Sequence, residues 1–436
     1  MVIHSYWREN RRAFLTILFL LIISILIAAC VVGSSEPPPV LTPTPRPTEL
    51  PTQTPIPTVT DTPFVPKATL KIVSHSPLTG DLSTWGTDIM RAVELASEEL
   101  AEPLHSLGYA VELMSYDDQD SIEKAVSNAK EIVTDPAILC GVGHYTSRIT
   151  IQTTEIYHKS GLAFICPSCT NPTLTERHYV EVNRIAGRDD IQGKVGAQFV
   201  KAQGWTKVFV LTYSDGYSQN NADSFKREAR QVGLTIVGDM KTDAMENFEP
   251  FITRIQAAEA DVVYFSTVFP EQAGAFIREA RAAGYQDVVL GPDAINSPAL
   301  ATAAGPLMLD GAGAYFTSTY SWSGGYPGAT NFEETFATRY GSFPLEFSAQ
   351  AYDAAGICLK AIESASLAIG GEIPTRQDVA NAIRSMSNYQ GITGDYSFNK
   401  DGDPNLVKYF IYKVTGVDPD SWQPQRWGEP YEITPQ

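Results

Sequence analysis

The chain has 436 residues, which is more than one hydrophobic core usually organises. Asp and Glu number 50 against 32 Lys and Arg, so the formal net charge is −18. A surface of this sign repels phosphate backbones and anionic membrane faces, which argues against nucleic acid as a partner. No run after residue 30 is long and apolar enough to cross a bilayer.

The first 29 residues have the three parts of an export signal. Three arginines precede an apolar run over residues 13–29, and two alanines lie directly before Cys30. This segment is similar to a bacterial lipobox, in which the cysteine thiol is diacylated and the cysteine becomes the first residue of the mature protein. We therefore predict a signal peptide over residues 1–29, lipidation of Cys30, and an extracytoplasmic protein held at the cell membrane. The alternative is a transmembrane anchor, because 17 apolar residues are borderline for a span.

Residues 30–66 form a predicted stalk. Between Pro37 and Pro66 the chain has eleven Pro and eight Thr in thirty residues, and hardly any large apolar side chain. Such a segment cannot bury enough surface to fold, and its proline favours extended polyproline II. We expect a semi-rigid tether that holds the folded part clear of the lipid surface. Whether its threonines carry O-linked sugars stays open.

Short apolar strands alternate with helices through the first part of the folded region. The spacing of the apolar residues separates the two kinds of element. In chain order they are strand 69–75, helix 89–100, strand 109–115, helix 121–133, strand 137–141, helix 147–158 and strand 162–166.

A second series of the same kind begins after Arg184. It runs through helix 191–203, strand 207–213, helix 218–232, strand 234–238, helix 248–259, strand 261–266, helix 271–283 and strand 287–290. Three later helices and a final strand are expected at 331–340, 348–368, 377–386 and 407–414.

Strands separated by helices of this length are typical of βαβ units around a parallel sheet. Two series therefore predict an α/β fold with two doubly wound parallel-sheet lobes, and the later elements indicate that the chain recrosses between them. We expect lobe 1 to comprise residues 67–188 and 318–392, and lobe 2 to comprise residues 189–317 and 393–436.

Sequence signatures of the common enzyme classes are missing. The motifs G-x-x-x-x-G-K-[ST], G-x-S-x-G and H-E-x-x-H do not occur. The most enzyme-like motif is Cys166-Pro-Ser-Cys169, because a C-x-x-C after a strand is typical of thioredoxin-like redox sites. The residues that follow break a helix instead of starting one, so we favour a structural disulfide or a pair of buried thiols. With Cys140 and Cys358, the four cysteines permit three full pairings, and spacing does not choose among them.

The six histidines show no ligand-spaced cluster in the sequence, and we expect neither a metal nor a cofactor. His75 and His144 lie at predicted strand ends, where we interpret them as polar groups on the rim of a cleft. The run from Asn399 to Asp403 resembles a calcium loop only superficially, because the later ligands are absent, and we predict a tight turn.

Short motifs occur in order along residues 69–415. They are Ser76-Pro-Leu-Thr-Gly80, Trp85-Gly86, Tyr116-Asp-Asp118, Pro167-Ser-Cys-Thr-Asn-Pro172, Arg184 with Gly187, Gln192-Gly193, Gly291-Pro-Asp293, Ala351-Tyr-Asp-Ala354, and Gly394-Asp395 to Gly402-Asp403. This ordered set resembles the leucine/isoleucine/valine-binding proteins, the type I periplasmic substrate-binding components of branched-chain amino acid ABC transporters. The resemblance implies two lobes joined by three crossovers, with the ligand bound in the cleft between them.

The resemblance also implies a set of ligand contacts, none of them catalytic. Ser147 begins a predicted helix whose N–H groups favour an anion, and it matches a hydroxyl that holds the ligand carboxylate. Thr170 matches a second hydroxyl on the amino-acid head, and Ser168 supplies backbone groups nearby. Asp293 matches an acidic residue that pairs with the α-ammonium. Taken singly, the two hydroxyl residues are equally typical of a helix cap and a turn.

Trp85, Tyr217 and Phe269 match aromatic positions that pack against the ligand. The sequence departs from the family in three places: Val268 and Phe269 replace a more polar aromatic pattern, the acidic residue is Asp instead of Glu, and a His-Tyr pair lies just before Ser147. Because an apolar wall with a missing ring favours a larger apolar side chain, we expect a branched-chain or other apolar amino acid as the ligand.

These observations predict a monomeric, non-enzymatic solute-binding lipoprotein that captures an amino acid and delivers it to the membrane subunits of an ABC importer. Two alternatives stay open. One is a ligand-sensing protein that presents its bound state to a signalling partner, and the other is a binder of amides, urea or aromatic acids on the same fold.

Overall fold

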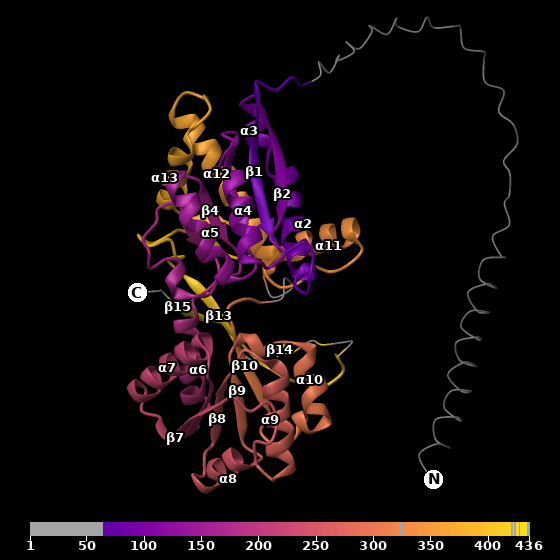
Figure 1. The fold of residues 1–436 in the computed structure, drawn as a ribbon, viewed down its shortest axis with the longest axis vertical. Helices are drawn as coiled ribbons and strands as arrows, with labels where there is room; N and C mark the ends of the chain where they lie inside the picture. The colour runs from indigo at the N-terminus through magenta and orange to yellow at the C-terminus, as the bar shows by residue number, and fades with distance from the viewer. Residues whose placement is uncertain (1–63, 322–325, 420–421, 423, 427, 434–436) are drawn as a thin grey trace, which may run out of the picture. The chain divides into compact units, whose positions relative to one another are not determined.

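The computed structural model describes residues 64–433 apart from 322–325, 420–421, 423 and 427, and these residues fold around two main β-sheets (Figure 1). The predicted signal peptide, Cys30 and most of the predicted stalk lie outside the described residues. Within the described part of the chain, no helix is both long and apolar enough to cross a membrane.

The first sheet has five parallel strands in the order β2-β1-β3-β4-β5. They are β1 (Ala68–Ser76), β2 (Tyr109–Asp117), β3 (Ile138–Gly143), β4 (Ala163–Cys166) and β5 (Val182–Arg184). Every residue of the central strand β3 is buried, as expected for a parallel strand covered on both faces.

Helices cover both faces of this sheet (Figure 1). One face is packed by α2 (Ser83–Glu99), α3 (Glu102–Ser106), α11 (Thr330–Tyr340), α12 (Ser348–Ala368) and α13 (Arg376–Ser385), and the other by α4 (Ile122–Ile132) and α5 (Ser147–Lys159). Side chains along β1 point alternately to the two faces of the sheet. Leu70 and Ile72 therefore pack with the α12 side, whereas Val73 packs with the α4 and α5 side.

The second sheet has the strand order β14-β13-β10-β9-β8-β6-β7, and β15 pairs with β13. The strands are β6 (Lys207–Tyr213), β7 (Thr235–Thr242), β8 (Val262–Ser266), β9 (Val288–Gly291), β10 (Ala314–Ser318), β13 (Val407–Lys413), β14 (Gln425–Arg426) and β15 (Tyr431–Ile433).

Side chains of β6 alternate between the two cores of this second sheet. Val208 and Val210 pack with α6 (Asp189–Ala202) and α7 (Gly216–Gln231). Phe209 and Leu211 pack with the helices of the other face, which are α8 (Glu249–Ala257), α9 (Pro270–Ala282) and α10 (Pro298–Ala304). Burying one such side chain fully is worth about 1.5–3 kcal/mol, so both faces stabilise the strand.

Shorter elements complete the described chain. They are the 3₁₀ helices η1 (Pro172–Leu174), η2 (Asp293–Ile295), η3 (Gly305–Leu309) and η5 (Pro327–Ala329), and the hairpin of β11 (Tyr389–Gln390) and β12 (Asp395–Tyr396).

Two features of the second sheet differ from the sequence-based expectation. The strand β10, next to β9, was not predicted, because its Thr and Ser and the preceding glycines are typical of a loop. The final strand β13 was predicted, but it pairs antiparallel with β10 and makes the sheet mixed instead of wholly parallel.

The chain passes between the two sheets three times. It leaves the first sheet after β5, returns after β10 to α11 and α12, and crosses again to β13 after α13. The predicted turn from Asn399 to Asp403 is confirmed, since Asn399 Oδ1 accepts backbone N–H groups from the residues that follow it. Asp403 then pairs with the buried Arg184 at 2.8 Å, which fastens this turn to the end of β5.

The structure selects one of the three possible cysteine pairings. Cys140 in β3 joins Cys358 in α12 across a sequence separation of 218, and Cys166 joins Cys169 within one loop. Both pairs are buried, so the first fastens a helix to the first sheet and the second closes the loop after β4.

Candidate functional site

The candidate residues all follow the carboxyl ends of strands, where ligands bind in open parallel sheets. Trp85 lies in α2 after β1, Ser147 begins α5 after β3, and Ser168 and Thr170 lie in the loop after β4. In the second sheet, Tyr217 lies in α7 after β6, Phe269 precedes α9 after β8, and Asp293 begins η2 after β9.

Asp293 is the centre of the acidic side of the site. Its Oδ1 accepts the hydroxyl of Tyr217 at 2.6 Å, and its Oδ2 accepts the hydroxyl of Thr319 at 3.2 Å. Its backbone N–H donates to Gln192 Oε1 at 3.0 Å. Burial raises the pKa of the Asp293 carboxyl, while these hydrogen bonds oppose the rise. A bound ammonium group would favour the ionised form of this carboxylate.

A second carboxylate, that of Asp189, lies close to Asp293. Gln192 connects the two, because its Nε2 donates to Asp189 Oδ1 at 3.4 Å. Burial and the charge of Asp293 together raise the pKa of Asp189, and a hydrogen bond from the Thr170 side chain opposes them. Sequence reasoning did not single out Asp189; its only signal was its place three residues before the Gln192-Gly193 motif.

The opposite side of the site presents hydrogen-bond donors. Ser147 occupies the first position of α5, and no side chain caps this helix end among the described residues. Its hydroxyl oxygen accepts the backbone N–H of Asn171 at 3.3 Å, so its proton remains available to an acceptor. The helix N-terminus adds a partial positive charge, and an anion bound here is therefore favoured.

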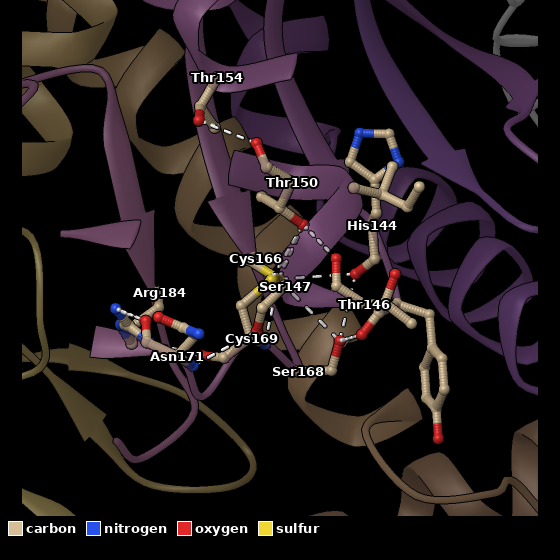
Figure 2. The surroundings of a disulfide bond; sticks show 12 residues. His144, Thr146, Ser147, Thr150, Thr154, Cys166, Ser168, Cys169, Asn171 and Arg184 are labelled. Atoms are coloured by element: carbon tan, nitrogen blue, oxygen red, sulfur yellow. Dashed lines mark hydrogen bonds between the residues drawn. A yellow bond between two sulfur atoms is a disulfide. The ribbon is translucent and has the colours of Figure 1, made fainter. Parts of the chain in front are cut away.

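The loop that carries Ser168 and Thr170 is closed by the Cys166–Cys169 disulfide, as Figure 2 shows. The Ser168 hydroxyl faces the backbone carbonyls of Tyr145 and His144, at 2.8 and 3.1 Å. Its proton is therefore used within the protein, which leaves the Ser168 side chain without a proton for a ligand carboxylate.

Arg184 holds the same loop from the other side. Its guanidinium donates to the carbonyls of Cys169 and Asn171, each at 2.8 Å (Figure 2). The Thr150 hydroxyl lies 3.0 Å from Cys169 Sγ and donates to the carbonyl of Thr146. Buried side chains and a covalent bond thus fix the backbone on both sides of Ser168.

Trp85 belongs to an aromatic group. Its indole N–H donates to Glu346 Oε1 at 2.9 Å, and its ring stacks on Tyr145 with centroids 5.9 Å apart. Sequence reasoning noted Tyr145 only as part of a departure from the family, and it missed Glu346, which no local motif marks.

Phe269 is less closely joined to the others. It is 36% exposed, and its ring lies edge-on to Tyr213 at 5.1 Å. Among the described residues, no hydrogen bond or ring contact joins it to Asp293 or Tyr217. The structure therefore groups Trp85 with the donor side and Tyr217 with Asp293, and it leaves Phe269 at the margin.

The interpretation of His75 and His144 as polar groups on a cleft rim is wrong, because both are fully buried beneath the first sheet. They form a cluster with Asp118 that spacing along the chain did not reveal. Each ring nitrogen has a hydrogen-bond partner, namely Tyr157 and Asn128 for His75, and Asp118 and Thr153 for His144. Burial lowers the pKa of His75 and lowers that of His144 to about 3, so both rings stay neutral inside the fold.

Comparison with known proteins identifies the relatives of this chain. Residues 69–418 match the family described as periplasmic binding protein. The Leu/Ile/Val-binding protein homolog 2 of Brucella abortus (strain 2308) is 30% identical over 353 residues, which cover 79% of this chain and 90% of that protein.

Solved structures share the fold. The leucine binding protein LivK of Thermotoga maritima is 24% identical and covers 84% of this chain and 99% of its own, with a TM-score of 0.67. A solute-binding protein from R. palustris, solved with benzoate, is 18% identical and covers 84% of this chain and 98% of its own, with a TM-score of 0.64.

These findings confirm the resemblance, the type I periplasmic binding protein fold and the expectation of a binding protein instead of an enzyme. The matched family is extracytoplasmic, and its members work with transporter subunits in the membrane. The family match covers nearly the whole folded region, and the chain belongs to the periplasmic binding protein family.

Proposed function

We propose that this protein is a lipid-anchored solute-binding protein that captures a branched-chain or other apolar amino acid and delivers it to the membrane subunits of an ABC importer. Asp293 would pair with the α-ammonium, Ser147 and the N-terminus of α5 would hold the carboxylate, and the Thr170 hydroxyl, which donates to Asp189, would contact the amino-acid head through its oxygen. The rings of Trp85 and Tyr217 would contact the side chain.

The observation that carries this proposal is the convergence of opposite chemistries from the two sheets. The backbone N–H of Asp189 donates to the carbonyl of Thr170 at 2.9 Å, and Gln192 joins Asp189 to Asp293, so the acidic side and the donor side meet. An amino acid carries an anion and a cation on one carbon atom, and it complements both sides at once.

A ligand that touches both sides would stabilise a closed arrangement of the proposed lobes, residues 67–188 with 318–392 and residues 189–317 with 393–436. It would do so only by the contacts that differ between the open and closed forms. The name of the Brucella relative and the leucine-binding name of the Thermotoga structure support an apolar amino acid as the ligand.

A thermal-shift screen of the purified folded region against the twenty amino acids, simple amides, urea and benzoate tests the proposal. We expect leucine, isoleucine, valine or phenylalanine to raise the Tm, and aspartate and glutamate to leave it unchanged because Asp293 and Asp189 repel them. Stabilisation by benzoate alone would favour the aromatic-acid alternative, which the R. palustris neighbour makes a specific candidate.

The anchor is proposed on the sequence before Cys30. Expression of the full chain in a bacterial host with labelled fatty acid should give a labelled, shortened protein. The Cys30→Ser variant should remain an unlabelled precursor. Normal processing and labelling of this variant would contradict the lipoprotein proposal, and ligand binding by the soluble region would be unaffected.

A further inference from the structure

Glu346 carries a half-buried carboxyl group that the proposed contacts do not use. It lies between α11 and α12, and its Oε1 accepts the indole N–H of Trp85. Burial raises the pKa of Glu346 to about 7, and the charge of Asp293 adds to the rise. Because Trp85 is itself a proposed ligand contact, this hydrogen bond places the Glu346 side chain beside the candidate site, although it comes from a different part of the chain.

In the described part of the chain this carboxyl group has no counter-charge. Among the residues that the structure describes, no Lys, Arg or His lies within ion-pair distance of Glu346 or of Asp293. A carboxyl group held in poorly solvated surroundings without a counter-charge is costly to ionise. A ligand that brings a positive charge would remove that cost.

Aromatic rings surround the carboxyl group. Trp85 stacks on Tyr145, Tyr145 lies edge-on to Phe347 at 6.3 Å, and Tyr320 lies 4.6 Å from Phe347. Glu346 joins this group through its hydrogen bond to Trp85 and as the residue directly before Phe347, and burial followed by the charge of Glu346 raises the pKa of both Tyr145 and Tyr320. Rings grouped around an anion are a common arrangement for binding organic cations, since each ring face attracts positive charge.

The backbone at this position is held in an unusual conformation. Phe347 has a φ of 65°, which a non-glycine residue adopts only at some cost. The preceding Leu345 donates its N–H to Asp88 Oδ2 at 3.2 Å, and this bond ties the loop to α2. The fold thus holds Glu346 against Trp85 at the expense of local strain.

From this arrangement we propose that the site, besides apolar amino acids, takes a ligand with a second positive charge at the end of its side chain, and that Glu346 binds that charge. The inference rests on the proposed function, because it places the α-ammonium on Asp293. Lysine and arginine have the required form. Their aliphatic stems pack on aromatic rings as a branched side chain does, while their charged ends reach a carboxylate.

The test compares ligands of matched shape by calorimetry on the soluble folded region. Lysine is paired with norleucine, and arginine with the neutral citrulline. We expect one of the two cationic ligands to bind at least about tenfold more tightly than its neutral counterpart. The Glu346→Gln variant keeps an acceptor for the Trp85 indole, and it should abolish this difference while leaving norleucine affinity within about twofold.

A matched control is Glu334→Gln, which removes an exposed charge from α11 and should preserve the difference. The Tm of each variant without ligand verifies folding. Norleucine and citrulline that bind as tightly as lysine and arginine would overturn this inference and leave the proposed function intact. Failure of every amino acid to bind would overturn both.

Discussion

The loops after β3 and β4 of the first sheet present hydroxyl and N–H groups to the candidate site, whereas the loop after β9 of the second sheet presents a carboxylate. Ser147, Thr170 and the N-terminus of α5 belong to the first group and Asp293 to the second, while Asp189 begins α6 on the crossover that leaves β5 of the first sheet. Two sheets of similar construction therefore make opposite chemical surfaces, because the difference lies only in the few residues that follow each strand. An amino-acid head fits between such surfaces in one orientation.

The two sides also differ in how their backbones are held. A disulfide and the buried guanidinium of Arg184 hold the donor loop, while the acidic side depends on hydrogen bonds among Tyr217, Gln192 and Asp293. Backbone groups and short hydroxyl side chains cannot compensate for a shift of the loop that carries them. A disulfide that fixes this loop therefore fixes the positions of its proposed ligand contacts. Four changes test this comparison.

The largest expected effect comes from the acidic side. Asp293→Asn removes the charge that would pair with the α-ammonium but keeps a side chain of the same shape. A buried charged pair broken in this way costs about 2–5 kcal/mol, or more than about tenfold in affinity. Calorimetry with the best ligand of the screen measures it. The exposed Asp310→Asn is the surface-charge control, and equal affinities in both variants would remove Asp293 from the site.

A smaller loss is expected on the donor side. Ser147→Ala removes one hydroxyl but leaves the N–H groups of α5, and a hydrogen bond to a charged group is worth about 1.5–3 kcal/mol. Affinity should fall by about tenfold or more, and by less than for Asp293→Asn. Ser160→Ala, at the other end of the same helix, should leave affinity unchanged. A Ser147→Ala protein with native affinity would assign the carboxylate to the backbone alone.

The third prediction is that the preference for a cationic ligand depends on pH through the ionisation of Glu346. Because burial raises the pKa of Glu346 to about 7, the group is mostly ionised at pH 8 and mostly protonated at pH 6. A cationic ligand needs the ionised form, so the ratio of lysine to norleucine affinity should fall about tenfold as the pH drops through this range. Asp293, Tyr145 and Tyr320 face Glu346, but both ligands share the same α-ammonium, and titration of Asp293 cancels in the ratio.

The Glu346→Gln variant should show a constant ratio between pH 6 and pH 8. A ratio that keeps its pH dependence in this variant would assign the titration to another group.

The smallest effect on binding is expected from removal of the disulfides. The two disulfides should differ in the quantity they affect, which is ligand affinity for one and the free energy of unfolding for the other. Removing Cys166–Cys169 by paired Cys→Ala changes loosens the loop of Ser168 and Thr170, and affinity should fall a few-fold. Removing Cys140–Cys358 opens a much longer loop, which should lower the free energy of unfolding by about 2–4 kcal/mol and spare affinity. Denaturant unfolding and calorimetry on both variants measure the two quantities. The reverse pattern would contradict the different roles assigned to the two bonds.

Sequence reasoning anticipated the fold because parallel strands covered on both faces must be apolar along their whole length. The run 207–213 is typical. Its successive side chains belong to the hydrophobic cores on the two opposite faces of the second sheet, so nearly every residue must be apolar. The family resemblance proposed Asp293, Ser147 and Thr170 as ligand contacts, and each of them follows the end of such a strand. Two strands that contain polar residues were not predicted. They are β5 and β10, whose polar residues pair only with neighbours that the tertiary fold supplies.

By itself, the sequence determined the alternation of strands and helices, the ordered motifs, and the kinds of residue that follow each strand. The tertiary structure alone decided which distant residues meet. Cys140 pairs with Cys358 across 218 residues, His75 and His144 lie inside the protein instead of on a rim, and Glu346 reaches Trp85 from the far end of the chain. Local patterns record which face of an element is buried, but contacts between remote segments depend on how the sheets and crossovers pack, which no short stretch of sequence encodes.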